Sequence, residues 1–253
     1  MSDRAAIQAH WNQRATLGPT AGTNDLIAQQ LEQRAILEAC QGLPDPAFGL
    51  EIGCGAGDTA RLLVQTFPRL DLLAVDGAAQ MIATAKSRPY PSARLRFKVC
   101  DALQLPDGRF DLILTQRCLI NLPTWELQRQ ALEGIAARLA PGGRYVMCEN
   151  SQDGLDAINQ TRQSIGLPAI ERPWHNRYIH HDELHQIRGM ALVDCRCFSA
   201  EYYFLSRIVN AWLAEREDRE PEYDAPINQL ATLLSTAVAA RFAQGRVWVW
   251  RRA

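Results

Sequence analysis

Short apolar runs alternate along this chain with longer segments in which apolar residues recur every three or four positions. The short runs are typical of buried strands, and the longer segments are typical of amphipathic helices. Seven strands are expected, over residues 48–52, 71–75, 94–99, 110–115, 143–148, 191–198 and 246–250. Strands that alternate with helices predict an α/β fold, a doubly wound, seven-stranded, mostly parallel sheet with helices on both faces.

Residues that favour the start or the end of a helix mark the helices between these strands. They are expected over residues 58–67, 78–87, 124–139 and 181–190. Thr124 can cap its helix with a side-chain hydroxyl. Pro141 and the two glycines after it are expected to stop that helix and turn the chain into the next strand. The reason is that proline cannot continue a helix and glycine accepts positive φ.

Three segments lie outside this alternation. Residues 1–41 are expected to form an N-terminal helical arm, and residues 42–253 the main domain. Within the main domain, residues 151–180 and 199–245 are insertions, and the second is long enough to carry helices of its own. Binding specificity or subunit contacts, such as those of a homodimer, could reside in these additions.

Composition narrows the class of protein. The 253 residues are 47% hydrophobic and 22% charged, which fits one globular domain with appendages. The net charge of −1 gives no overall basic field that would attract nucleic acid or an anionic membrane. Neither a signal peptide nor a membrane span is expected, which predicts a cytoplasmic protein. Seven cysteines, an odd number, favour reduced thiols, and Cys195 and Cys197 lack a second ligand pair at zinc-site spacing.

The strongest chemical signal is a glycine-dense run from Glu51 to Asp58, which follows an apolar strand and opens a helix. Gly53, Gly55 and Gly57 omit side chains where a ligand must approach the backbone, and N–H groups at the helix end point into the same space. A mere tight turn rarely needs three alternating glycines. The third glycine comes one residue too early for the dinucleotide fingerprint, which disfavours NAD.

The spacing E-x-G-x-G-x-G resembles motif I of class I S-adenosylmethionine-dependent methyltransferases, and the resemblance extends over residues 48–250. It implies a Rossmann-like methyltransferase fold, an enzyme, and S-adenosyl-L-methionine as the cofactor. Glu51 and the three glycines would then bind the cofactor, with Glu51 helping to orient the methionine ammonium through water. Asp76 ends the second strand, where a carboxylate can take both ribose hydroxyls.

Further positions match the motif order of that family. Asp101 and a backbone N–H of Ala102 or Leu103 correspond to the groups that hold the adenine amino group, although a helix-capping or turn aspartate would look the same. Met81 could cover the adenine or pack in the core. The backbone near Gln116 and Arg117 would face the methionine portion.

The acceptor is expected over the carboxyl end of the fifth strand, where a doubly wound sheet opens a crevice. Glu149 and Asn150 end that strand, and Glu149 is a candidate base for a hydroxyl acceptor. The insertion over residues 151–180, here called the connector, adds Arg162 and Trp174 as candidate contacts to a polyhydroxylated or anionic acceptor. His175 is the other candidate base, although a loop histidine is more often structural.

No metal is expected. His181 and His185 are four residues apart, but Asp182 stands where the zinc-protease pattern has glutamate. The acidic residues there favour a helix N-terminus instead. The fourth-strand loop also lacks the Asn/Asp-Pro-Pro-aromatic motif of methyltransferases that act on base amines. Together with the charge, this predicts a small-molecule or glycan acceptor and no nucleic acid.

The N-terminal arm, with Trp11 and Arg14, is similar to a cofactor-covering arm of some class I methyltransferases. Arg14 could pair with the cofactor carboxylate or lie solvated on an amphipathic helix. Together with the loop around Trp174, the arm resembles methyltransferases linked to bacterial surface-polysaccharide biosynthesis. The sequence thus predicts O-methylation of a sugar hydroxyl. The alternatives are methylation of another small metabolite, at a carboxylate or nitrogen, and a non-catalytic cofactor-binding subunit.

Overall fold

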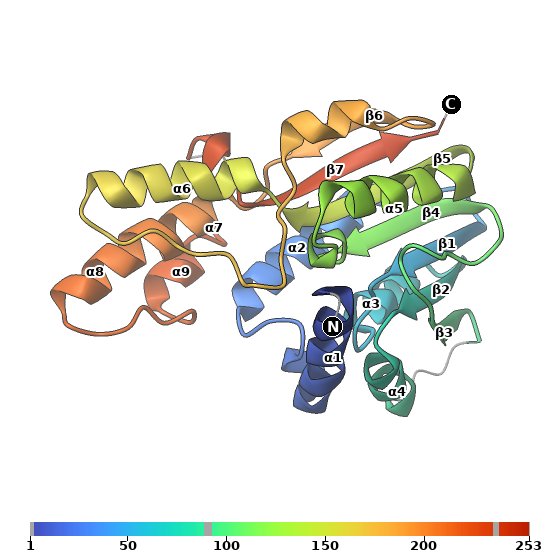
Figure 1. Ribbon diagram of the computed structural model, residues 1–253, viewed down its shortest axis with the longest axis horizontal. Coiled ribbons are helices and arrows are strands. Elements are labelled where there is room, and N and C mark those ends of the chain that lie inside the picture. Colours follow the sequence, from blue (N-terminus) through green and yellow to red (C-terminus); the bar gives the residue numbers. More distant parts are fainter. Residues whose placement is uncertain (1–2, 89–92, 235–237, 253) are drawn as a thin grey trace.

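The computed structural model describes residues 3–88, 93–234 and 238–252. Seven strands within them form one sheet in the order β3-β2-β1-β4-β5-β7-β6 (Figure 1). Neighbouring strands are parallel, except that β7 runs antiparallel to both β5 and β6. This arrangement confirms the predicted seven-stranded, mostly parallel sheet. The strands are β1 (Ala47–Ile52), β2 (Leu70–Asp76), β3 (Leu95–Val99), β4 (Phe110–Gln116), β5 (Leu139–Asn150), β6 (Ala191–Arg196) and β7 (Gly245–Arg251).

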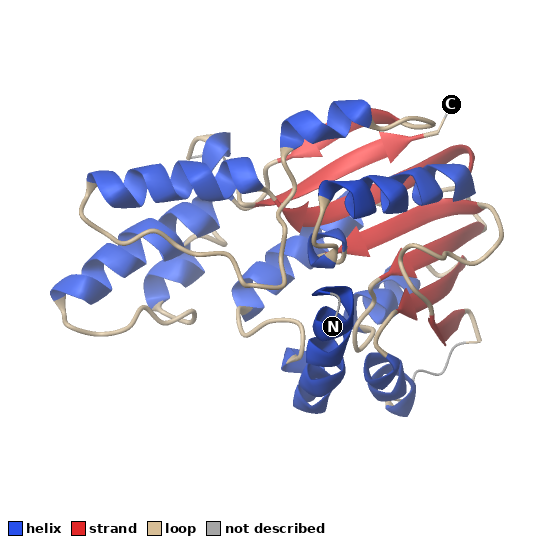
Figure 2. Ribbon diagram, viewed as in Figure 1, coloured by secondary structure: helices blue, strands red, loops and turns tan. Residues whose placement is uncertain are grey.

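Helices cover both faces of the sheet (Figure 2). α2 (Leu26–Ala39) and α3 (Asp58–Thr66) pack on one face, and α5 (Trp125–Arg138) packs on the other. α4 (Ala79–Ser87) contacts β2, β3 and the N-terminal α1 (Asp3–Arg14). The other helical segments are η1 (Ala15–Thr20), η2 (Leu119–Asn121), α6 (Gln152–Ser164), η3 (His181–Gln186), α7 (Ala200–Phe204), the π-helical turn η4 (Leu205–Val209), α8 (Asn210–Arg216), α9 (Pro226–Leu230) and η5 (Ala240–Phe242).

The strands bury side chains on both faces of the sheet. On β4, Leu112 and Leu114 pack with residues of α2 and α3, while Ile113 packs with Leu132 and Ile135 of α5. The alternation follows from the strand period of two. Because each central strand is covered on both faces, its sequence is a continuous apolar run rather than an alternating one.

The end of α5 differs from the expectation. Thr124 caps the helix as predicted, accepting a hydrogen bond from a first-turn backbone N–H at 3.4 Å. The helix ends at Arg138, before Pro141, because Leu139 is already extended and pairs with Phe110 of β4. Pro141 and its glycines therefore lie in the irregular start of β5, where the register with β4 shifts.

The predicted helix over residues 181–190 is wrong in kind and length. The segment forms only the short 3₁₀ turn η3, because the backbone is extended at Ile187 and has positive φ at Gly189. Residues 199–245 carry α7, α8 and α9, as predicted, whereas α6 was not foreseen. These helices gather beyond the carboxyl ends of the parallel strands (Figure 1). Within the described ranges, no helix has the length and apolarity that crossing a membrane requires.

Two helical glycines form a matched pair for a stability test. A Cβ on Gly154 of α6 would lie 2.4 Å from the Ala243 carbonyl oxygen, whereas Gly134 of α5 faces open space. We expect Gly154→Ala to lower the free energy of unfolding by about 1–3 kcal/mol through overpacking. Gly134→Ala should raise it by about 0.5–1 kcal/mol, because alanine loses less backbone entropy in a helix. Chemical denaturation measures both changes. A Gly154→Ala protein of wild-type stability would show that α6 can shift away from the segment before β7.

Candidate active site

The turn between β1 and α3 needs glycine for two different reasons. Gly53, Gly55 and Gly57 have φ of 75°, 52° and 79°. A Cβ on Gly53 would lie 2.5 Å from the Cys118 sulfur, and one on Gly57 would lie 2.6 Å from the Phe97 ring. Gly55 has nothing within 4 Å of such a Cβ. Two of the glycines thus allow neighbouring segments to approach, and Gly55 leaves its backbone open to a ligand.

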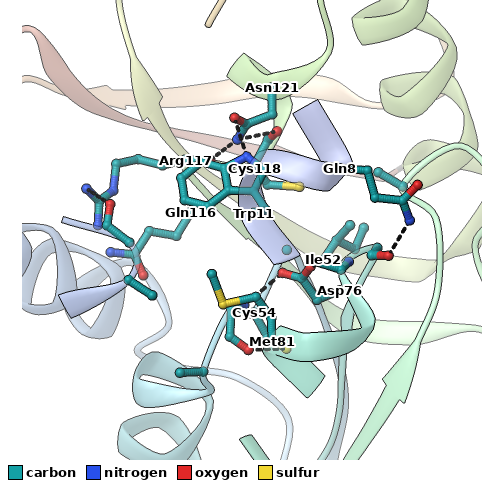
Figure 3. Close-up of a pocket in the computed structure, with 18 of the residues that line it drawn as sticks. Gln8, Trp11, Ile52, Cys54, Asp76, Met81, Gln116, Arg117, Cys118 and Asn121 are labelled. Atoms are coloured by element: carbon teal, nitrogen blue, oxygen red, sulfur yellow. Dashed lines mark hydrogen bonds between the residues drawn. The ribbon is translucent and has the colours of Figure 1, made fainter. Parts of the chain in front are cut away.

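A cavity of about 420 Å³, here called the first cavity, lies at the carboxyl ends of β1, β2 and β4. Figure 3 shows Trp11 on one side of it and Asp76 and Met81 on the other. Gly57 and Arg14, which the sequence also assigned to the cofactor, are not part of its lining. The lining includes the other residues assigned to the cofactor: Glu51, Gly53, Gly55, Asp76, Met81, Asp101, Ala102, Gln116 and Arg117.

Asp76 is fixed at the end of β2 by backbone donors. Its Oδ2 accepts a hydrogen bond from the Gly55 N–H at 2.9 Å, and its Oδ1 accepts one from the Ala78 N–H at 2.7 Å. Burial raises the pKa of Asp76, and these two bonds oppose the rise. A carboxylate oxygen can accept more than one hydrogen bond. Asp76 therefore retains the capacity to hold two adjacent hydroxyl groups.

Glu51 is a buried acid with an unused oxygen. Only 2% of its surface is exposed, and its Oε2 has no hydrogen-bond partner among the described residues. Burial, with smaller contributions from the nearby carboxylates of Asp76 and Asp58, raises the pKa of Glu51 to about 8. A cation in the first cavity would lower that pKa and pair with the free oxygen. Glu51 is therefore well suited to hold an ammonium group.

Helix α1 lies over the first cavity and is held there by polar side chains. Gln8 donates to the Gly77 carbonyl at 2.7 Å, and the Trp11 indole N–H donates to Asn121 Oδ1 at 3.0 Å. The sequence indicated a covering arm but singled out Arg14. The spacing of positions 4, 8 and 11 could have identified the covering face, because residues three and four apart share one side of a helix.

Asp101 already has two protein partners. Its Oδ1 accepts a hydrogen bond from the Leu103 N–H at 2.8 Å, which is the turn role that the sequence left open. Its side chain also forms an ion pair with Arg4 of α1. Asp101 thus fixes its own turn and fastens α1 over the cavity.

A second cavity, of about 310 Å³, adjoins the first. The two share Trp11, Gly22, Arg117 and Asn121 in their linings. The rest of the second lining is mostly polar or aromatic: His10, Arg14, Thr23, Asp25, Ala28, Glu32, Ile120, Asn150, Pro173, His175, Asn176, Tyr178, Tyr203, Arg207, Tyr223 and Gln244.

The charges around the second cavity do not cancel. Arg207 pairs with Asp25 at 2.8 Å, and Arg117 pairs with Glu32 at 3.1 Å. Arg14 makes no ion pair with any residue that the structure describes, and its Nε donates to a backbone carbonyl at 2.7 Å. With its histidines neutral, the cavity carries one positive charge in excess.

Two of the predicted acceptor residues, Asn150 and His175, line the second cavity. Asn150 Oδ1 and His175 Nδ1 are buried and have no partner in the described part of the chain. Burial, with smaller contributions from His10 and Arg14 nearby, lowers the pKa of His175 to about 4. At neutral pH, His175 is therefore uncharged and a weak base, with one ring nitrogen that donates a hydrogen bond and one that accepts.

Glu149 reaches neither cavity lining, which corrects the expectation that it contacts the acceptor. It neighbours Asn150 on β5, and successive strand residues point to opposite faces. Its buried carboxylate accepts hydrogen bonds from the N–H groups of Cys118, Leu119 and Ile120 at 3.1, 3.0 and 3.4 Å. Burial raises the pKa of Glu149 to about 7 against the effect of these bonds. Glu149 holds the loop after β4.

Arg162 and Trp174 are also placed differently from the expectation. Arg162 is buried in α6, where its guanidinium donates to the carbonyls of Pro168, at 2.7 Å, and Arg207. It fixes the connector and lines neither cavity. Trp174 is 65% exposed, and its ring packs 5.3 Å from the His175 ring, outside the cavity lining.

The segment that carries the glycine turn, Asp76 and Asp101 matches a known family, described as a methyltransferase domain, over residues 50–143. Residues 50–143 are thus similar to a methyltransferase domain, and the match covers less than half of the chain. The chain is similar to malonyl-[acyl-carrier protein] O-methyltransferase of Paenibacillus sp. (strain JDR-2), with 31% identity over 56% of this chain and 54% of that protein. It is also similar to trans-aconitate 2-methyltransferase of Variovorax paradoxus (strain S110), with 30% identity over 52% and 48%. The chain spans about half the length of these relatives.

Solved structures share the fold over nearly the whole chain. A Haloferax volcanii methyltransferase in complex with the activator Trm112 has a TM-score of 0.63 and 16% identity, covering 96% of this chain and 97% of its own. The N-methyltransferase NodS of Bradyrhizobium japonicum, in complex with S-adenosyl-L-homocysteine, has a TM-score of 0.58 and 16% identity, covering 100% and 99%. These likenesses confirm the predicted Rossmann-like methyltransferase fold.

The methyltransferase domain implies S-adenosylmethionine as the cofactor, and the first cavity fits it. The unused Glu51 oxygen suits the ammonium of the methionine portion, and Asp76 suits the ribose hydroxyls. Gly55 leaves backbone exposed between these two acids. Met81 is 3% exposed and lines the cavity, so it serves the core and can also touch the adenine.

Glu51 should release a proton when S-adenosyl-L-homocysteine binds. At pH 7, a pKa of about 8 keeps most of this carboxyl protonated, and an ammonium beside it would lower the pKa. Affinity should therefore rise with pH towards 8. Calorimetry in buffers of different ionisation enthalpy counts the protons, and Glu51→Gln should release about one proton fewer than the wild type. Equal counts in the two proteins would remove Glu51 from the ammonium site.

Asp76→Ala should weaken binding of S-adenosyl-L-homocysteine at least about tenfold, because charge-assisted hydrogen bonds contribute about 1.5–3 kcal/mol each. Asp71→Ala is the matched control, since Asp71 lies in the same strand but pairs with Arg96 away from the cavity. Calorimetry measures both affinities, and denaturation checks that both variants fold. A folded Asp76→Ala protein with wild-type affinity would contradict the ribose assignment.

Proposed function

We propose that this protein transfers a methyl group from S-adenosylmethionine in the first cavity to a small-molecule acceptor in the second. The observation that carries the proposal is the wall of Trp11, Arg117 and Asn121 that the two cavities share. A donor on one side and an acceptor on the other would meet there. Of the two relatives, one is named for trans-aconitate, a small acid, and the other for a malonyl group carried on a protein, which supports a methyl acceptor group of this size.

When bound, S-adenosylmethionine supplies a methyl group that its sulfonium activates. Methyl transfer from a sulfonium is an in-line displacement, so the protein contributes alignment and exclusion of water. Glu51 and Asp76 would hold the two ends of the donor. Trp11 covers the donor from α1, and Asn121 stands at the opening towards the acceptor.

For the acceptor we propose a sugar hydroxyl. The lining of the second cavity is rich in amides and tyrosines, which suit a polyhydroxylated ligand. His175 Nδ1 is available to accept the hydrogen bond of the reacting hydroxyl. A weak base at this position would assist proton removal only as the new bond forms.

A carboxylate is the second candidate acceptor, and Arg14 favours it. The excess positive charge of the second cavity would attract an anion. A carboxylate is already deprotonated at neutral pH and needs no base. The malonyl and trans-aconitate methyltransferases among the relatives are named for acids.

A labelled methyl donor tests the proposal. We expect label to move from S-adenosylmethionine to acceptors in pools of glycans, nucleotide sugars and metabolic acids. Asp76→Ala should lower this transfer at least about tenfold at low donor concentration. Mild alkali then distinguishes the acceptors, because it hydrolyses a methyl ester and leaves a methyl ether intact. Binding of S-adenosyl-L-homocysteine without transfer to any pool would support a non-catalytic cofactor-binding subunit instead.

A further inference from the structure

Three polar side chains from separate segments meet in the second cavity: Asn150 at the end of β5, Tyr178 in the connector after α6, and Gln244 just before β7. Backbone hydrogen bonds fasten these segments together. The Ile179 N–H donates to the Asn150 carbonyl at 2.9 Å, and the Ser151 N–H donates to the Gln244 carbonyl at 2.7 Å. Asn150, Tyr178 and Gln244 are 9%, 6% and 7% exposed. They therefore form a fixed wall rather than a loose surface loop.

The hydrogen bonds of this wall leave acceptors unused. The Gln244 amide donates to the Tyr178 hydroxyl at 3.4 Å, and the Asn150 side chain bonds to the same hydroxyl. Asn150 Oδ1 and Gln244 Oε1 are then buried without any partner that the structure describes, as is His175 Nδ1. Buried polar groups are normally paired. Two unused amide oxygens and an unpaired imidazole nitrogen around one cavity therefore indicate a ligand that donates several hydrogen bonds.

The charge of the cavity restricts the kind of donor. An ammonium group donates hydrogen bonds, but Arg14 gives the cavity its excess positive charge and would repel it. Hydroxyl groups donate hydrogen bonds without carrying charge. They match both the unused acceptors and the positive surroundings.

We propose that Asn150, Gln244 and His175 form a subsite that recognises the hydroxyl groups of a polyhydroxylated acceptor, with the Tyr178 hydroxyl holding the two amides. The inference rests on the proposed function, because it takes the second cavity as the acceptor site. Since both amides bond to one hydroxyl, their free oxygens would accept from neighbouring hydroxyls of one ligand. The acceptor is then a neutral or anionic polyol of the sugar type. Simple acids and polyamines leave the subsite unsatisfied.

Saturation-transfer NMR on the full chain with S-adenosyl-L-homocysteine bound tests this subsite, because it detects binding at millimolar concentrations. The probes are the methyl glycosides of glucose, galactose and mannose, succinate as an acid without hydroxyls, and spermidine as an amine. We expect at least one glycoside to receive magnetisation, and succinate and spermidine to receive none. Asn150→Ala and Gln244→Ala should each weaken binding of that glycoside by about five- to tenfold.

Tyr178→Phe keeps the ring and removes the hydroxyl that orients the amides, so it should weaken glycoside binding and leave the affinity for S-adenosyl-L-homocysteine unchanged. Gln163→Ala, which alters an exposed amide of α6, is the matched control and should change neither affinity. A wild-type protein that fails to bind S-adenosyl-L-homocysteine would refute the proposed function itself. With that ligand bound, two results overturn the subsite: no glycoside binds, or both amide variants keep wild-type glycoside affinity.

Discussion

The buried carboxylate of Glu149 is the interaction on which both cavities depend. It accepts three successive backbone N–H groups after β4, at distances of 3.0 to 3.4 Å. Without an acceptor, each buried donor would cost about 1–3 kcal/mol. The loop can therefore turn sharply inside the core, with Arg117 in a left-handed conformation at φ 48°. That turn places Arg117 and Asn121 in the wall between the cavities.

This loop joins parts of the chain that are far apart in sequence. Asn121 Oδ1 accepts from Trp11 of α1 at 3.0 Å and from Asn176 of the connector at 3.2 Å. Arg117 reaches in the other direction, to Glu32 of α2. The helix over the first cavity and the lining of the second thus share one network of polar contacts. A substitution in this network would affect both cavities, whereas a change at Asn150 or Gln244 would affect only the second.

The sheet and the first cavity were largely predictable because their signals are local. Apolar runs mark strands that are buried on both faces, and Asp76 follows the glycine turn at a spacing set by one helix and one strand. The residues assigned to the acceptor could not be placed from the sequence, because their positions depend on strand orientation and on contacts between distant segments. Glu149 and Asn150 differ by one position, yet only Asn150 lines a cavity. Arg162 has the right chemistry for an anion contact, but the path of the connector turns it inwards to bind carbonyl groups.

The way in which helix α1 is attached bears on how a ligand enters and leaves the first cavity. The hydrogen bonds that fasten it over the first cavity come from its side chains, such as Gln8 and Trp11, and involve no backbone ladder. Such bonds contribute about 0.5–1.5 kcal/mol each, so the helix can lift without disturbing the sheet. η1, where Gly18 has φ 61°, joins α1 to the rest of the chain and is a suitable hinge. A ligand held in the first cavity would lie beneath α1, so its release would require this helix to move.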